Sequence, residues 1–103
     1  MYQISFYVPI HDAEKVKTAM FSAGAGRFNN YTQCAWQTEG KGQFMPVKDA
    51  QPTVGKLDVL ETIAEYKVEM MCTSDSLNAV ISALKKKHPY EEVAYCVVKM
   101  ETI

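Results

Sequence analysis

The sequence has no excess of charge of either sign and no long apolar run, and each absence excludes a class of protein. Its 11 lysines and arginines nearly balance 12 aspartates and glutamates, which leaves a net charge of −1. Proteins that bind nucleic acid or an anionic membrane carry a basic surface, and this balance indicates none. No segment approaches the roughly 20 consecutive apolar residues of a membrane-spanning helix. We therefore expect no nucleic-acid partner and no membrane.

Cysteine is scarce, and its placement indicates a reducing compartment. The three cysteines, Cys34, Cys72 and Cys96, are an odd number and form no CxxC pair. Secreted disulfide frameworks usually hold an even number at tight spacing, so we expect free thiols. The N-terminus also lacks the basic and apolar regions of a secretion signal. The sequence thus predicts a cytoplasmic protein, and its length fits a single domain, residues 1–103.

Hydrophobic periodicity predicts four strands and two helices. Strands, in which apolar and polar residues alternate, are expected at residues 2–8, 31–38, 60–72 and 93–100. One helix is expected from Asp12 to about residue 23, where glycines end it, and the other from Ser74 to Pro89. Between the second and third strands, a turn is expected at residues 39–42 and a short returning arm at residues 43–47. Residues 48–56 are expected to form a loop.

Without the extra arm, the order of elements is βαββαβ. This is the split β-α-β pattern of the α+β, ferredoxin-like folds, in which two helices cover one face of an antiparallel sheet. The other face is then available for a partner subunit. In the third strand Glu65, Lys67 and Glu69 alternate with apolar residues, which predicts that their side chains form a charged, solvated part of this open face.

The sharpest local signal is the run His88-Pro89-Tyr90-Glu91-Glu92, between the second helix and the last strand. A histidine, a phenol and two carboxylates on one loop can act as metal ligands or as an acid and base pair. The alternative interpretation is structural: Pro89 ends the helix, His88 extends its cationic last turn, and Tyr90 packs.

A second signal is the glycine-rich segment from Gly24 to Tyr31, whose backbone amides and Arg27 could hold an anion. Dinucleotide-binding glycines follow a strand and open a helix, whereas these close a helix. The local pattern therefore favours the alternative role, helix termination. No GxxxxGK[ST] motif for a nucleoside triphosphate is present.

Three segments together resemble the YqfO-type, or Nif-three-like, insert domain. They are residues 24–31 (GAGRFNNY), 69–72 (EMMC) and 88–97 (HPYEEVAYCV). In the larger YqfO proteins this domain lies between two halves of a dinuclear-metal hydrolase-like domain, and it is similar in fold to the CutA and PII-like proteins, which are usually trimeric. The resemblance implies the same fold and self-association as a trimer. Because the flanking halves are absent, we expect this chain not to be an enzyme.

We therefore expect a cytoplasmic, homo-oligomeric binding or regulatory module that takes a small ligand or a protein partner. The expected contact residues are Arg27, Asn30, Tyr31, His88, Tyr90, Glu91 and Glu92. A second hypothesis is a zinc or copper site in the CutA manner, with His88 and Glu91, alone or with a cysteine, as ligands. A third is acid–base catalysis by His88 with a neighbouring glutamate, but no nucleophile or cofactor motif accompanies that pair.

Overall fold

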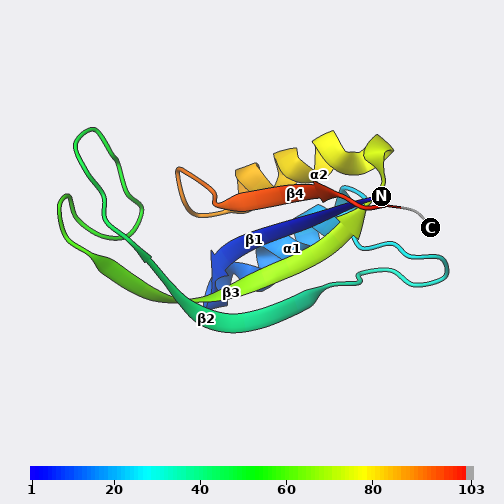
Figure 1. Ribbon diagram of the computed structural model, residues 1–103, viewed down its shortest axis with the longest axis horizontal. Coiled ribbons are helices and arrows are strands. Elements are labelled where there is room, and N and C mark those ends of the chain that lie inside the picture. The colour runs from blue at the N-terminus through cyan, green and yellow to red at the C-terminus, as the bar shows by residue number, and fades with distance from the viewer. Residues whose placement is uncertain (102–103) are drawn as a thin grey trace.

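The computed structural model describes residues 1–101 and shows a four-stranded antiparallel sheet with two α-helices on one face (Figure 1). The strand order is β2-β3-β1-β4. In chain order the elements are β1 (Tyr2–Pro9), the 3-10 turn η1 (Ile10–Asp12), α1 (Ala13–Ser22), β2 (Trp36–Phe44), β3 (Glu61–Cys72), α2 (Ser74–Lys87) and β4 (Tyr95–Lys99). This topology confirms the expected ferredoxin-like βαββαβ fold.

The core lies between the sheet and the helices. On β1, Ile4, Phe6 and Val8 are fully buried, and the register places them opposite Met70, Val68 and Tyr66 of β3 on the helix-facing side. Both helices contribute apolar stripes, whose fully buried members are Val16, Met20, Val80 and Leu84. Alternation along the strands and the three-to-four-residue spacing along the helices thus bury one face of β1, of β3 and of each helix.

The prediction for residues 31–47 is wrong in its boundaries. The strand starts at Trp36 and runs without a break to Phe44, so neither the turn at residues 39–42 nor the separate returning arm exists. Gly40 and Gly42, which suggested the turn, lie in the strand opposite Glu65 and Ile63. Neither glycine has a positive φ, so neither reverses the chain, and only Gly42 is closely approached by another side chain.

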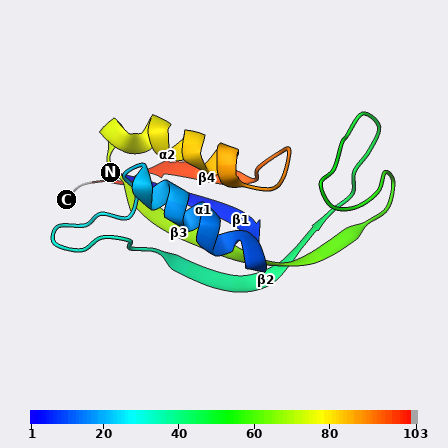
Figure 2. The same ribbon diagram turned by 180° about the vertical axis from the view of Figure 1, so that it is seen from behind.

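The reversal between β2 and β3 is instead made by residues 45–60, which we call the long connection. It contains the predicted loop at residues 48–56 and has no helix or strand. Figures 1 and 2 show β2 and β3 curving away beyond the end of β1, with the long connection folded back toward the loop that follows α2. At this end the two strands and the long connection thus curve around the open face (Figures 1 and 2).

The glycine-rich segment terminates α1, as one interpretation of the sequence predicted. Gly24 and Gly26 have φ values of +119° and +75°, which residues other than glycine rarely adopt. The Gly26 amide donates a hydrogen bond to the Met71 carbonyl, 2.8 Å away, and so fixes the segment to β3. This segment and the loop after α2 lie at opposite ends of the sheet (Figures 1 and 2).

Neither helix has the length and apolar character that crossing a membrane requires, within the residues that the structure describes.

Candidate ligand-binding groove

A groove of about 860 Å³ lies where the open face of the sheet is hollowed. It is bounded by β2, by the start of the long connection, and by residues 88–94, which we call the HPYEE loop. Its lining includes Tyr7, Gly42, Phe44, Val47, Pro52, Glu65 and Tyr90. Ligand sites are typically concave, of about 300–1,000 Å³, and mainly apolar with a few polar groups, and the groove has these properties.

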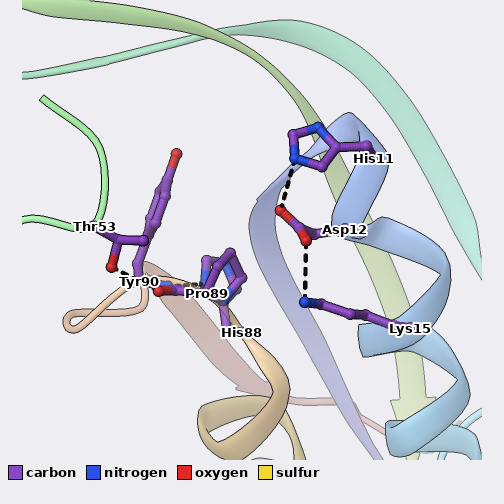
Figure 3. Close-up of polar contacts among 7 residues, drawn as sticks. All are labelled: His11, Asp12, Lys15, Thr53, His88, Pro89 and Tyr90. Carbon is purple, nitrogen blue, oxygen red and sulfur yellow. Dashed lines mark hydrogen bonds and ion pairs between the residues drawn. The ribbon is translucent and has the colours of Figure 1, made fainter.

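Two hydrogen bonds join the long connection to the HPYEE loop. The Gln51 amide donates to Oε1 of Glu91 over 2.9 Å, and the Thr53 hydroxyl donates to the Pro89 carbonyl over 2.8 Å. Figure 3 shows Thr53 reaching Pro89 while the Tyr90 side chain extends from the same loop. The Phe44 and Tyr90 rings also pack, with centroids 5.9 Å apart. These contacts hold the two walls of the groove together.

His88 is buried beneath the HPYEE loop and uses both ring nitrogens for hydrogen bonds. The Tyr90 amide donates to Nδ1 over 3.1 Å, so Nδ1 carries no proton and Nε2 donates to the Tyr7 carbonyl, 2.6 Å away. Burial lowers the pKa of His88, which is only 6% exposed. The interpretation that His88 extends the cationic turn of α2 is therefore wrong. The neutral ring joins β1 to the HPYEE loop and orients Tyr90.

The Tyr90 hydroxyl is buried and has no hydrogen-bond partner of good geometry in residues 1–101. Burial, followed by the negative charges of Glu65, Asp12 and Glu61, raises the pKa of Tyr90 to about 12. The phenol therefore keeps its proton, and its oxygen retains unused hydrogen-bonding capacity. Buried polar atoms are normally paired, so an unpaired one at the wall of a groove indicates a place for a ligand group.

Glu65 is the second polar group in the groove, and it is only 8% exposed. Burial raises the pKa of its carboxyl, and hydrogen bonding to the Tyr90 hydroxyl, whose geometry is poor, partly offsets that rise. The carboxyl oxygen lies over Gly42, in the space that a Cβ atom there would fill. The expectation that Glu65 belongs to a solvated face is wrong, because the curved strands and the HPYEE loop cover it.

The structure brings together only part of the predicted site. Tyr90, Glu91 and Glu92 line the groove, and His88 supports it from below. The other three predicted contact residues lie on the exposed loop after α1, at the far end of the sheet: they are Arg27, Asn30 and Tyr31. Arg27 lines a separate, smaller hollow of about 280 Å³. One chain therefore does not unite the two clusters.

Two groove residues, Gly42 and Glu65, were not among the predicted contacts. The glycine was assigned to a turn, and the glutamate was assigned to a solvated face. The signal in the sequence was this pair of residues. Gly42 lies on an edge strand, and its register partner Ile63 is two residues from Glu65 on the next strand. Recognising it requires the correct pairing of β2 with β3, which local sequence does not give.

The residues expected to bind zinc or copper do not fit a metal in this arrangement. Metal ligation needs an imidazole nitrogen with a free lone pair, and the Nδ1 lone pair of His88 already accepts the Tyr90 amide. Oε1 of Glu91 accepts the Gln51 amide. Residues 1–101 contain no group of three or more histidines, cysteines, aspartates or glutamates placed to hold a metal ion.

Several proteins are similar to this chain along most of its length. A Mycobacterium leprae protein named GTP cyclohydrolase 1 type 2 homolog is 43% identical over 89 residues, which are 86% of this chain and 23% of that protein. The Bacillus subtilis protein of the same name is 39% identical over 99 residues, 96% of this chain and 26% of that protein. A solved structure, the Bacillus cereus protein related to NIF3, superposes with a TM-score of 0.83 at 35% identity. The match covers 98% of this chain and 26% of that one.

The chain is homologous to one segment of the YqfO, or NIF3-related, proteins. The resemblance seen in the sequence is thereby confirmed. The chain spans about a quarter of the length of these relatives. It shares its fold with CutA1 from Pyrococcus horikoshii, which superposes with a TM-score of 0.70 at 18% identity and covers 100% of this chain and 86% of CutA1. No family model matches the chain.

Proposed function

We propose that this NIF3-related chain is a non-enzymatic binding or regulatory module that takes a small ligand in the groove. The observation that carries the proposal is the buried, unpaired Tyr90 hydroxyl at the wall of a largely apolar groove. Leaving a buried hydroxyl without a partner costs about 1–3 kcal/mol. A ligand that supplies the missing hydrogen bond recovers this energy and buries the apolar walls as well.

The geometry supports binding better than catalysis. Both ring nitrogens of His88 are engaged with backbone groups, so the ring has no free site from which to exchange a proton with a substrate. Tyr90, with a pKa of about 12, does not ionise near neutral pH. The name of the relatives describes whole proteins, and this chain corresponds to only a quarter of their length.

The second part of the proposal is that the module self-associates in the cytoplasm, as a trimer. The open face carries exposed apolar side chains at Tyr7, Trp36 and Val98, and the register places all three on the side away from the helices. Within one chain the loop that carries Arg27, Asn30 and Tyr31 lies apart from the HPYEE loop (Figure 1). A closed ring of subunits can place one cluster beside the other across each boundary.

Native mass spectrometry of protein purified without added metal or chelator tests the proposal. We expect an oligomer that retains a bound mass, and Tyr90→Phe, which removes only the hydroxyl, to reduce the retained mass at least severalfold. Tyr95→Phe is the matched control, because its side chain is exposed and lies outside the lining of the groove. Equal retention by wild type and Tyr90→Phe, or a wild-type spectrum without any bound mass, would contradict a ligand at this hydroxyl. A zinc or copper increment would support the metal hypothesis instead.

A further inference from the structure

The groove carries more negative than positive charge. Its lining includes five glutamates and two lysines. One of the two, Lys67, already faces a carboxylate, since its Nζ lies 3.7 Å from Oε1 of Glu69. The negative charge is therefore not neutralised within the groove, and a cationic group is electrostatically favoured there.

Glu65 is the most buried of these carboxylates and has no cationic partner among residues 1–101. None of the ion pairs in residues 1–101 involves it, although its side chain is more than nine-tenths buried. A buried carboxylate is normally paired with a cation or held by several hydrogen bonds, because burial removes its hydration. Glu65 is left with its carboxyl directed over Gly42 and into the groove.

The walls beside Glu65 suit a cation that has an apolar body. Phe44 and Tyr90 present aromatic rings to the groove, and ring faces attract ammonium and guanidinium groups. The unpaired Tyr90 oxygen is available to accept a hydrogen bond from an N–H group. Pro52 and Val54 of the long connection add further apolar surface to the lining. Charge, hydrogen bonding and shape therefore favour the same kind of occupant.

We propose that the groove binds a small organic cation, whose ammonium or guanidinium group contacts both Glu65 and the Tyr90 hydroxyl and whose apolar body packs on Phe44. This inference rests on the proposed function, because it names the chemistry of the ligand that the groove takes. Its size limit follows from the groove volume of about 860 Å³, which accommodates a small molecule with some tens of atoms.

Three probes of similar size test the charge preference: phenethylammonium, 2-phenylethanol and 3-phenylpropionate. Each has a phenyl ring on a short chain, and their polar ends are cationic, neutral and anionic. Binding is followed by nuclear magnetic resonance at the amides of Gly42 and Tyr90. We expect the cation to bind roughly tenfold more tightly than the alcohol, the difference made by one charge-assisted hydrogen bond, and the anion to bind most weakly.

Glu65→Gln removes the charge while keeping the shape of the side chain. We expect the variant to bind the cation and the alcohol with about equal affinity. Glu14→Gln is the matched control, because Glu14 is an exposed glutamate on α1, and it should keep the wild-type ratio. If Glu65→Gln does not give a folded amide spectrum, Gly42→Ala replaces it, since the added Cβ displaces the carboxyl of Glu65 from the groove floor.

Equal binding of cation and alcohol by wild type, or tighter binding of the anion, would overturn the inference and leave the groove as a ligand site for another chemistry. An absence of shifts with all three probes would also overturn it, while retention of a bound mass in native spectra would still support the proposed function. A blocked arginine tripeptide forms a fourth arm. If it binds more tightly than phenethylammonium, the cation belongs to a protein side chain and the assignment to a small molecule is wrong.

Discussion

The carboxyl of Glu65 occupies the space that a side chain at position 42 would need. The two residues lie on neighbouring strands, and Oε1 of Glu65 meets the place of the missing Cβ of Gly42. Gly40, two residues earlier on the same strand, has nothing within 4 Å of its own missing Cβ. The pair Gly42 and Glu65 therefore forms a floor for the groove that depends on the absence of one side chain.

Gly42→Ala is expected to expose Glu65 and so lower the pKa of its carboxyl toward the ordinary value. Burial is the main cause of the raised pKa, and the alanine Cβ drives the flexible end of the side chain toward solvent. Carbon-detected titration of the Glu65 carboxyl measures the change. Gly40→Ala, which adds a methyl group in open space on the same strand, should leave the Glu65 pKa at its wild-type value. A raised pKa that persists in Gly42→Ala would mean that the close approach does not bury the carboxyl.

The fold followed from periodicity because β1, β3 and both helices each have one clearly apolar face. Alternation in β1 and the apolar stripe of α2 identify which residues reach the core, and βαββαβ is the arrangement that buries them all. The boundaries of β2 were harder to predict, because its side chains are mostly exposed and its two glycines are typical of turns. Pairing with β3 decides its extent, and pairing is a property of the whole sheet.

The site was only half visible in the sequence. The HPYEE run was recognised because its residue types are unusual on one short loop, and three of its members line the groove. The burial of Glu65 was not predicted, because alternation places its side chain on the open face and gives no information on the distant residues that cover that face. Tyr90 lies 25 positions later in the chain, on the loop after α2, so only the tertiary fold brings it to Glu65.

Tyr90→Phe is expected to stabilise the fold while it weakens ligand binding. The hydroxyl is buried without a partner, so its removal relieves an unfavourable desolvation of about 1–2 kcal/mol. Urea unfolding of the ligand-free protein measures the free energy of unfolding. Tyr31→Phe should change it by less than about 0.5 kcal/mol, as surface substitutions usually do. A clear loss of stability in Tyr90→Phe would show that the hydroxyl has a partner in solution.

His88 is expected to make the protein less stable in mild acid. Its pKa is lowered in the folded state, so the unfolded chain binds the proton more readily. The stability that the neutral ring contributes is therefore fully present above the unfolded pKa of about 6.5 and is lost as the pH falls through the lower, folded pKa. Urea unfolding between pH 8 and pH 5 should show this decline.

His88→Gln tests the assignment, because the glutamine amide can still donate to the Tyr7 carbonyl but does not titrate. We expect a lower stability at pH 8 and a smaller decline toward pH 5 than in wild type. The control is His11→Gln, since the His11 side chain is 84% exposed, and it should keep the wild-type decline. An unchanged decline in His88→Gln would assign the pH dependence to other groups.

Breaking the two hydrogen bonds between the long connection and the HPYEE loop is expected to open the groove without unfolding the protein. Thr53→Val removes the bond to the Pro89 carbonyl, and Glu91→Ala removes the acceptor of the Gln51 amide. Both bonds are exposed, so each contributes only about 0.5–1.5 kcal/mol.

Hydrogen exchange at the Gln51 amide should accelerate severalfold in the double variant, while exchange in β1 stays slow because the core is untouched. Thr62→Val, an exposed change on β3, is the control and should leave exchange at Gln51 as in wild type. If exchange at Gln51 does not change in the double variant, these two bonds do not hold the wall of the groove in place.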